Sequence, residues 1–143
     1  MSYTTYIVTI NLYSMKKILA FILLAIILLA TAYYAFIYYS TYSEGVRSGE
    51  LIKFSRKGVV VKTWEGEISQ GISGAQIFKF SVEDTKKEVI ADLEKFQGRY
   101  VKVYYIERFG TLFWLGDTKY FITKVEEEQS PHFGGLKAVE NEY

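Results

Sequence analysis

A long apolar segment near the N-terminus constrains this chain more than any other feature. From Ile18 to Tyr39 no side chain carries a formal charge, and most are Ile, Leu, Ala, Phe or Tyr. As a helix this segment would be about 33 Å long, enough to cross a hydrocarbon core of about 30 Å. A helix that is apolar all round needs lipid or a large protein surface to cover it, and so short a chain cannot supply that surface. We therefore predict a membrane-spanning helix.

Both ends of the predicted span carry residues typical of membrane interfaces. Lys16 and Lys17 directly precede it, and a cluster of tyrosines lies at its C-terminal end. Basic residues favour the cytoplasmic side, so the two lysines predict a cytoplasmic N-terminus. Arg47, Lys53, Arg56 and Lys57 follow the span at increasing distance and compete with them. The two lysines abut the helix directly, whereas most of the later basic residues are expected to belong to folded structure. We expect a single-pass membrane protein with an extracytoplasmic domain.

The boundaries of the span leave two alternatives open. A Met-Lys-Lys sequence at 15–17 is typical of a translation start, so residues 1–14 are interpreted as unstructured or as an upstream extension. The anchor is then assigned to residues 15–41. An Ala-Thr-Ala sequence ending at Ala32 is typical of signal-peptide cleavage. The apolar run continues well past that site, which favours a retained anchor.

After the anchor the pattern changes to short apolar runs of period two separated by turn residues, which is typical of β-strands. We predict strands over 51–55, 59–68, 76–82, 100–108 and 119–126. A tight turn at 56–58 would join the first two strands into a hairpin. A helix over 84–96 is predicted between the third and fourth strands, with Asp84 as its N-cap and Gly98 at its end.

The order β-β-β-α-β-β is that of the OB-fold, a small Greek-key barrel. We therefore assign residues 42–128 to a small mainly-β, OB-fold-like barrel domain. An SH3-like barrel or another small β-roll is the alternative. The polar, glycine-containing stretch 129–143 is interpreted as a flexible tail.

The composition and the missing motifs argue against an enzyme. The chain has no cysteine and a single histidine, His132, which falls in the predicted tail. No sequence typical of a nucleophile elbow, a zinc-binding helix, a phosphate loop or a dinucleotide site occurs. Glu65 and Glu67 alternate along a predicted strand and are interpreted as solvated surface charges. We predict a non-catalytic protein with no cofactor and no metal.

One face of the predicted domain is a candidate ligand surface. OB-folds bind ligands across their second and third strands and the adjoining loops. Here these regions carry basic, aromatic and acidic side chains: Arg56, Lys57, Lys62, Trp64, Lys79, Trp114 and Asp117. Such groups can hold a phosphate-bearing chain, a glycan or an acidic peptide. The alternative is that the two tryptophans pack in or around the core and that Lys57 only solvates a turn.

Several short motifs extend from the end of the anchor into the domain. They are YSEGxRSG at 42–49, LxKFSRKG at 51–58, KTWEGE at 62–67 and GDTxYF at 116–121. With them the chain, from Met15 onward, resembles a family of uncharacterised short single-span membrane proteins of Bacteroidetes. Many members carry the automatic label "6-phosphogluconate dehydrogenase". The resemblance implies no catalytic residues, and a dehydrogenase needs a βαβ nucleotide fold that this pattern lacks, so we reject that label.

The leading hypothesis is a membrane-anchored envelope protein whose β-barrel domain binds or scaffolds another envelope protein or polymer. An OB-type nucleic-acid-binding module facing the cytoplasm, acting through Lys62, Lys79 and both tryptophans, is the alternative. With 17 basic and 16 acidic residues the chain lacks the basic excess of a nucleic-acid binder. The basic residues shortly after the span are a further candidate, for contact with anionic lipid headgroups.

Overall fold

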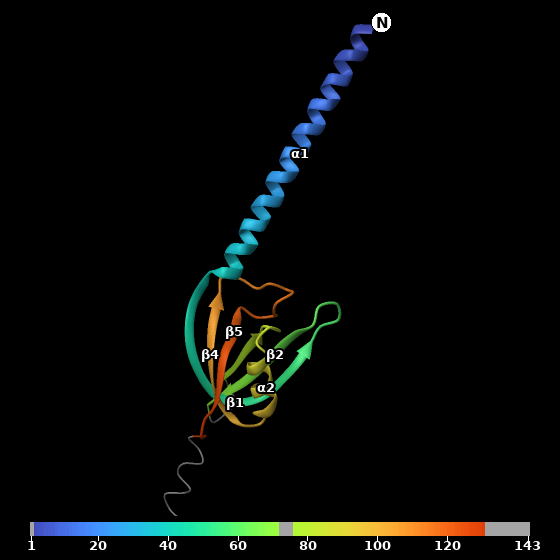
Figure 1. Cartoon of the computed structure of the whole chain (residues 1–143). Coiled ribbons are helices and arrows are strands. Elements are labelled where there is room, and N and C mark those ends of the chain that lie inside the picture. Colours follow the sequence, from blue (N-terminus) through green and yellow to red (C-terminus); the bar gives the residue numbers. More distant parts are fainter. Residues whose placement is uncertain (1, 72–75, 131–143) are drawn as a thin grey trace, which may run out of the picture. The chain divides into compact units, whose positions relative to one another are not determined.

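The computed structural model describes residues 2–71 and 76–130, with side chains from residue 13 onward. It consists of an N-terminal helix and a small mainly-β domain that begins at Ser40 (Figure 1). Helix α1 (Ser2–Tyr39) includes Tyr13–Tyr39, a stretch long and apolar enough to cross a membrane. The helical backbone also includes residues 2–14, which the sequence analysis had left outside the anchor.

Five strands of the described part of the domain form one closed sheet. They are β1 (Thr41–Lys57), β2 (Thr63–Gln70), β3 (Gln76–Val82), β4 (Tyr100–Arg108) and β5 (Tyr120–Glu127). Their order around the sheet is β1-β2-β3-β5-β4, with β1 and β4 closing the circle. Neighbours are antiparallel except β3 and β5, which run parallel and are joined at one paired position, Ser81 with Phe121. The sheet is therefore closed but uneven.

Strand β1 is much longer than the predicted strand over 51–55. Its first part pairs with β4, from Thr41 opposite Arg108 to Glu50 opposite Tyr100. Its second part pairs with β2 as far as Lys57, across a shift in register next to Leu51. Strand β1 is thus paired with both β2 and β4, and this double pairing closes the sheet.

The hairpin between β1 and β2 differs from its prediction. The expected turn at 56–58 was wrong, because Arg56 and Lys57 remain paired in the β1–β2 ladder. The connection is instead a loop over 58–62, in which Gly58 adopts a φ of 126°. The valines at 59–61 were assigned to a strand because they are β-branched and apolar, but they lie in this loop and are exposed.

Helix α2 (Lys87–Lys95) covers one end of the sheet and packs against β5 and β1. The expected cap was wrong: Lys86 precedes the helix, and no side chain caps it. The Asp84 carboxylate instead accepts a hydrogen bond from the Trp64 ring at 3.1 Å. Gly98 follows the helix with a φ of 75°, a conformation that glycine adopts without strain.

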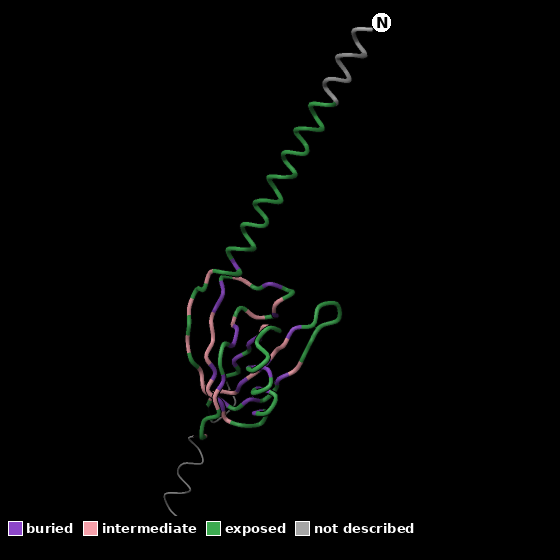
Figure 2. Tube along the Cα trace, viewed as in Figure 1, coloured by how far each residue is buried: buried purple, intermediate pink, exposed green. Residues whose placement is uncertain are grey.

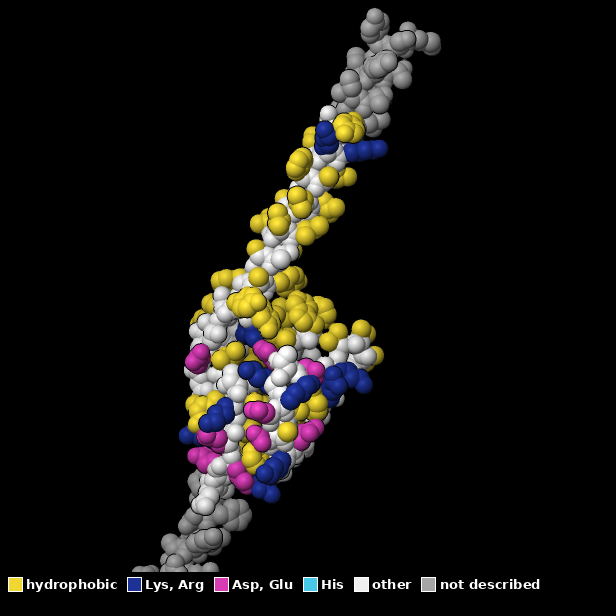
Figure 3. Space-filling model, in the orientation of Figure 1, with side chains coloured by type: hydrophobic (Ala, Val, Ile, Leu, Met, Phe, Trp, Pro, Cys, Tyr) yellow, Lys and Arg dark blue, Asp and Glu magenta, His cyan; other side chains and the backbone are white. Residues whose placement is uncertain are grey.

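The core lies inside the closed sheet, and every strand and α2 contribute buried residues to it (Figure 2). Its fully buried hydrophobic side chains include Leu51, Ile68, Phe80, Leu93, Val101, Val103 and Phe121. Charged side chains of both signs lie on the outer surface of the domain (Figure 3). Strands β3 and β4 have the predicted bounds, and β5 is displaced by one residue. The predicted tail lies outside the described residues from position 131, and so does His132.

Candidate functional site

The outer face of three neighbouring strands presents a row of polar side chains. Across β2 and β3, Glu65 lies opposite Ser81 and Glu67 lies opposite Lys79. Successive residues of a strand point to opposite sides of a sheet. These side chains therefore share the face opposite to the one on which Phe80 enters the core.

A hollow of about 280 Å³ lies on this face. It is bordered by β1, β2, β3 and the loop between β4 and β5. Its lining combines lysines, carboxylates and hydroxyls: Lys53, Ser55, Lys57, Glu65, Gly66, Glu67, Lys79, Phe80, Asp117 and Thr118. Three basic and three acidic residues among these leave the hollow with nearly balanced charge.

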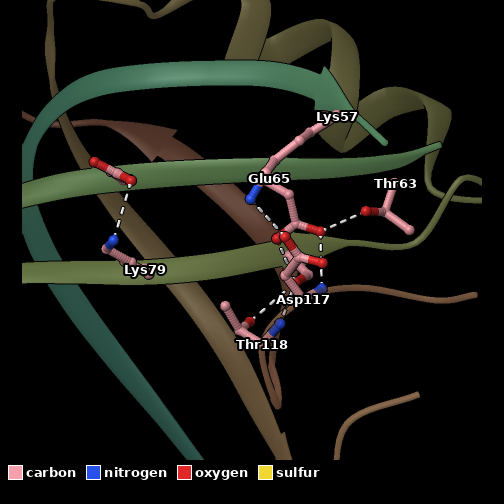
Figure 4. Close-up of polar contacts among 8 residues, drawn as sticks. Lys57, Thr63, Glu65, Lys79, Asp117 and Thr118 are labelled. Atoms are coloured by element: carbon pink, nitrogen blue, oxygen red, sulfur yellow. Dashed lines mark hydrogen bonds and ion pairs between the residues drawn. The ribbon is translucent and has the colours of Figure 1, made fainter. Parts of the chain in front are cut away.

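The Glu65 carboxylate holds the wall of this hollow together (Figure 4). One oxygen accepts hydrogen bonds from the Thr63 hydroxyl at 2.7 Å and the Asp117 backbone N–H at 3.0 Å. The other accepts from the Ser81 hydroxyl at 2.7 Å. The interpretation of Glu65 as a solvated surface charge was therefore wrong, because this side chain ties the β4–β5 loop to two strands.

The same loop makes a close approach to β3 at Gly116. A Cβ at this position would lie 2.4 Å from Ser81 Oγ, so a glycine is required. The backbone N–H of Thr118 donates to Ser81 Oγ at 3.1 Å, and the two hydroxyls lie 2.9 Å apart. Ser81 itself is fully buried. The loop is thus fixed at the point where β3 and β5 are joined by a single paired position.

Two ion pairs cross the hollow. Lys57 Nζ lies 2.8 Å from Asp117 Oδ2, and this hydrogen bond raises the pKa of Lys57. Lys79 Nζ lies 3.6 Å from Glu67 Oε1. Exposed ion pairs of this kind contribute only about 0–1 kcal/mol. A ligand with its own polar groups can therefore replace them at little cost.

Of the candidate ligand residues from the sequence, Lys57, Lys79 and Asp117 line this hollow together. Lys62 lies in the β1–β2 loop and is exposed, and it does not line the hollow. Trp114 lies in the β4–β5 loop, where its ring meets the edge of Phe113 at a centroid distance of 4.8 Å. These two residues are thus outside the hollow.

Arg56 and Trp64 occupy the other side of the same strands. The Trp64 ring stacks on Phe54 at a centroid distance of 5.2 Å and is packed against the core. The Arg56 guanidinium lies 5.9 Å from the centre of that ring and 3.7 Å from Asp84. Trp64 therefore packs at the rim of the core, the alternative that the sequence analysis had left open.

A second, more open hollow of about 510 Å³ continues from the first along the weakly joined β3 and β5. Both hollows share Lys79, Asp117 and Thr118, and the second adds apolar groups from Phe78 and Tyr120. The rings of these two aromatic residues lie 5.1 Å apart. A polar surface and an aromatic surface thus meet along one continuous depression.

The sequence analysis missed Ser81 and the role of Glu65. A signal was present, because Ser81 interrupts a strand whose neighbours are large apolar residues, and a buried hydroxyl needs a partner. Only the register of β2 against β3 identifies Glu65 as that partner. Among residues 2–71 and 76–130, no group of three or more His, Cys, Asp or Glu side chains is placed to hold a metal ion.

A family model described as a domain of unknown function, DUF8785, matches residues 40–132 of this chain. The match begins where the β domain begins and includes all of its strands. No curated protein and no solved structure matches the sequence.

Proposed function

This chain belongs to the DUF8785 family, and we propose that it is a membrane-anchored, non-catalytic binding protein of the bacterial cell envelope. Helix α1 would hold it in the inner membrane, and the β domain would bind or scaffold another envelope component. The proposal depends on the physical character of the two units, a long apolar helix and a small domain with a polar hollow.

We further propose that the domain is an OB-type barrel. The strand order β1-β2-β3-β5-β4, the parallel contact of β3 with β5 and the position of α2 between β3 and β4 all support this assignment. Ligands of OB-folds lie across the second and third strands and the loops beside them. The hollow lined by Glu65, Lys79 and Asp117 lies in that region of the sheet.

The observation that carries the binding function is the fixed β4–β5 loop beside exchangeable ion pairs. The Glu65 hydrogen bonds hold the wall in place through the protein's own groups, so little ordering is needed upon binding. The Lys57–Asp117 and Lys79–Glu67 pairs present charges of both signs to an incoming chain. Such a surface suits a near-neutral polymer or an extended protein segment.

Nucleic-acid binding has less support. Its proposed contacts required free cations and exposed rings along β2 and β3. Lys79 is paired with Glu67, and Trp64 is stacked on Phe54 with its N–H donated to Asp84. Lys62 and Trp114 lie outside the hollow, so the four proposed contacts do not form one binding surface.

Site-specific photocrosslinking in the native membrane tests the binding proposal. A benzophenone amino acid is placed at Lys53, which lines the hollow, and at Glu94, an exposed residue of α2, as the control. We expect one defined crosslinked species from Lys53 alone, weakened by Lys79→Ala. Identical products from both positions would contradict the proposal.

An activity assay tests the non-catalytic part of the proposal. Turnover of a defined substrate by the purified chain, abolished by one side-chain substitution, would contradict it.

The side of the membrane is tested with a cysteine at Glu94, because the native chain has no thiol. An impermeant maleimide is added to intact spheroplasts of cells carrying Glu94→Cys, with the cysteine-free chain as the control. We expect labelling before lysis. Labelling only after lysis would place the domain in the cytoplasm and would reopen the nucleic-acid alternative.

A further inference from the structure

Two neighbouring loops of the β domain expose large apolar side chains to solvent. In the β1–β2 loop, Val59 and Val60 are 97% and 94% exposed. In the β4–β5 loop, Phe113 is 73% exposed, and Phe109 and Trp114 are also exposed. Large apolar side chains that are exposed and lie close together mark a surface for another apolar partner.

The two loops lie at the same end of the domain. Lys57 ends β1 just before the first loop, and its ion pair with Asp117 of the second loop is 2.8 Å long. Figure 3 shows hydrophobic side chains gathered over these loops, whereas charged side chains lie over the strands below them. We call Val59, Val60, Phe109, Phe113 and Trp114 the apolar edge.

The start of β1 lies beside the apolar edge. Thr41 is paired with Arg108, the residue that precedes Phe109. The Tyr42 and Phe109 rings meet edge to face at a centroid distance of 5.3 Å. The beginning of the domain and the start of the β4–β5 loop are therefore adjacent within the sheet.

The covalent chain limits how far this end can lie from the end of the span. Helix α1 ends at Tyr39, and β1 begins at Thr41. Two residues of extended chain cover at most about 7 Å, whatever the direction of the helix. If Tyr39 lies at a membrane interface, Thr41 and its neighbour Phe109 are held within a few residue lengths of the same interface.

We propose that the apolar edge inserts into the headgroup region of the same lipid bilayer that α1 crosses. Trp, Tyr and Phe rings with an apolar body are the residues that this region accepts. Lys62 ends the valine loop and is exposed, and its charge suits anionic headgroups. The edge would thus hold the domain against the membrane and keep the hollow on the neighbouring face open to its ligand. This inference requires that α1 spans the bilayer but not that the hollow binds anything.

Depth-dependent fluorescence quenching tests this proposal with the full chain in lipid vesicles. Trp64→Phe leaves Trp114 as the sole tryptophan. The vesicles contain phosphatidylcholine brominated near the headgroup end of its acyl chains, or unbrominated lipid. We expect brominated lipid to quench Trp114 strongly and acrylamide in the water to quench it weakly. Phe113→Ser with Val60→Ser should reduce the lipid quenching.

A matched control places a tryptophan at an exposed apolar residue away from the apolar edge. Ile52 is 51% exposed and lies at the shift in register within β1. In a chain with both native tryptophans changed to Phe, Ile52→Trp should be quenched by acrylamide and not by brominated lipid. Acrylamide quenching of Trp114 equal to that control would overturn the proposal. Protection of Trp114 from both quenchers would also overturn it, because a protein surface would then cover the edge.

Discussion

The backbone N–H of Asp117 donates a hydrogen bond of 3.0 Å to the side chain of Glu65, although 52 positions separate the two residues in sequence. This bond joins the β4–β5 loop to the centre of β2. It turns a glutamate on the outside of a sheet into a structural residue of the hollow.

Glu65→Ala should lower the free energy of unfolding by about 2–3 kcal/mol, because it leaves the buried Ser81 hydroxyl and the Asp117 N–H without their acceptor. Urea unfolding of the full chain in detergent measures the loss, and hydrogen exchange at Asp117 and Thr118 should accelerate. Glu67→Ala is the control, since Glu67 makes a looser ion pair with Lys79 at 3.6 Å. It should cost about 0–1 kcal/mol. Equal losses for the two variants would contradict this role of Glu65.

Gly66→Ala should destabilise the domain by about 1–3 kcal/mol through overpacking. A Cβ at this position would lie 2.3 Å from the end of the Phe80 ring, which is fully buried and cannot withdraw. Phe80→Leu removes that end of the ring at its own cost. In the double variant the two losses should be less than additive, and a double-mutant cycle from urea unfolding measures the difference. Strict additivity of the two losses would show that the added Cβ at position 66 and the Phe80 ring do not compete for space.

The ion pair between Glu107 and Lys119 should make stability depend on pH in the acid range. The lysine lies 2.5 Å from the carboxylate, and its hydrogen bond lowers the pKa of Glu107. A lowered folded-state pKa stabilises the fold above the ordinary carboxyl range, and this contribution disappears as the pH falls through the folded-state pKa. Lys119→Met should therefore be less stable than the native chain at neutral pH, and the difference should shrink with acidification.

Unfolding curves between neutral and acid pH measure this difference. Lys53→Met, at an exposed lysine of β1, is the matched control for the loss of one positive charge. Its difference from the native chain should vary much less over the same range. If the Lys119→Met difference were constant with pH, Glu107 would not be the group responsible.

Arg108 and Glu83 form an ion pair in which the two side chains are 6% and 14% exposed. Glu83→Ala should cost about 3–5 kcal/mol, because it removes the carboxylate that is paired with a buried guanidinium. Replacing both residues by leucine should cost less than that single change, since no buried charge then remains. Urea unfolding of the two variants in parallel decides between the outcomes. A single variant as stable as the native chain would show that water replaces the carboxylate.

The sequence predicted β3, β4 and β5 almost to the residue but missed the first part of β1, whose pairing with β4 is non-local. Strand β3 has the predicted bounds because Phe78, Phe80 and Val82 alternate with residues on the other face. The first part of β1 contains Glu44, Gly45 and two serines, so it carries no apolar period. Its strand character comes from pairing with β4, fifty or more positions away, which a local pattern cannot show.

For the site, the sequence identified the right strands but not which face of the sheet each residue occupies. Lys57, Lys79 and Asp117 line one hollow because of how β1, β2 and β3 are paired and because an ion pair joins Lys57 to Asp117. Trp64 and Glu65 are neighbours in sequence, yet one packs on Phe54 and the other forms the wall of the hollow. A one-residue shift in register would exchange them. Spacing within a single strand cannot decide this, because the register depends on tertiary packing.

The length of β1 has a mechanical consequence. Tension along the chain from α1 enters the domain at Thr41, with only Ser40 between the helix and the strand. That strand is paired with β4 along its first part and with β2 along its second part. A pull on α1 is therefore carried by the hydrogen bonds of β1 to β4 and then to β2 rather than by a loop. A load that enters at Thr41 meets paired strands at once, so the domain has no loop at the point of attachment that could unravel first.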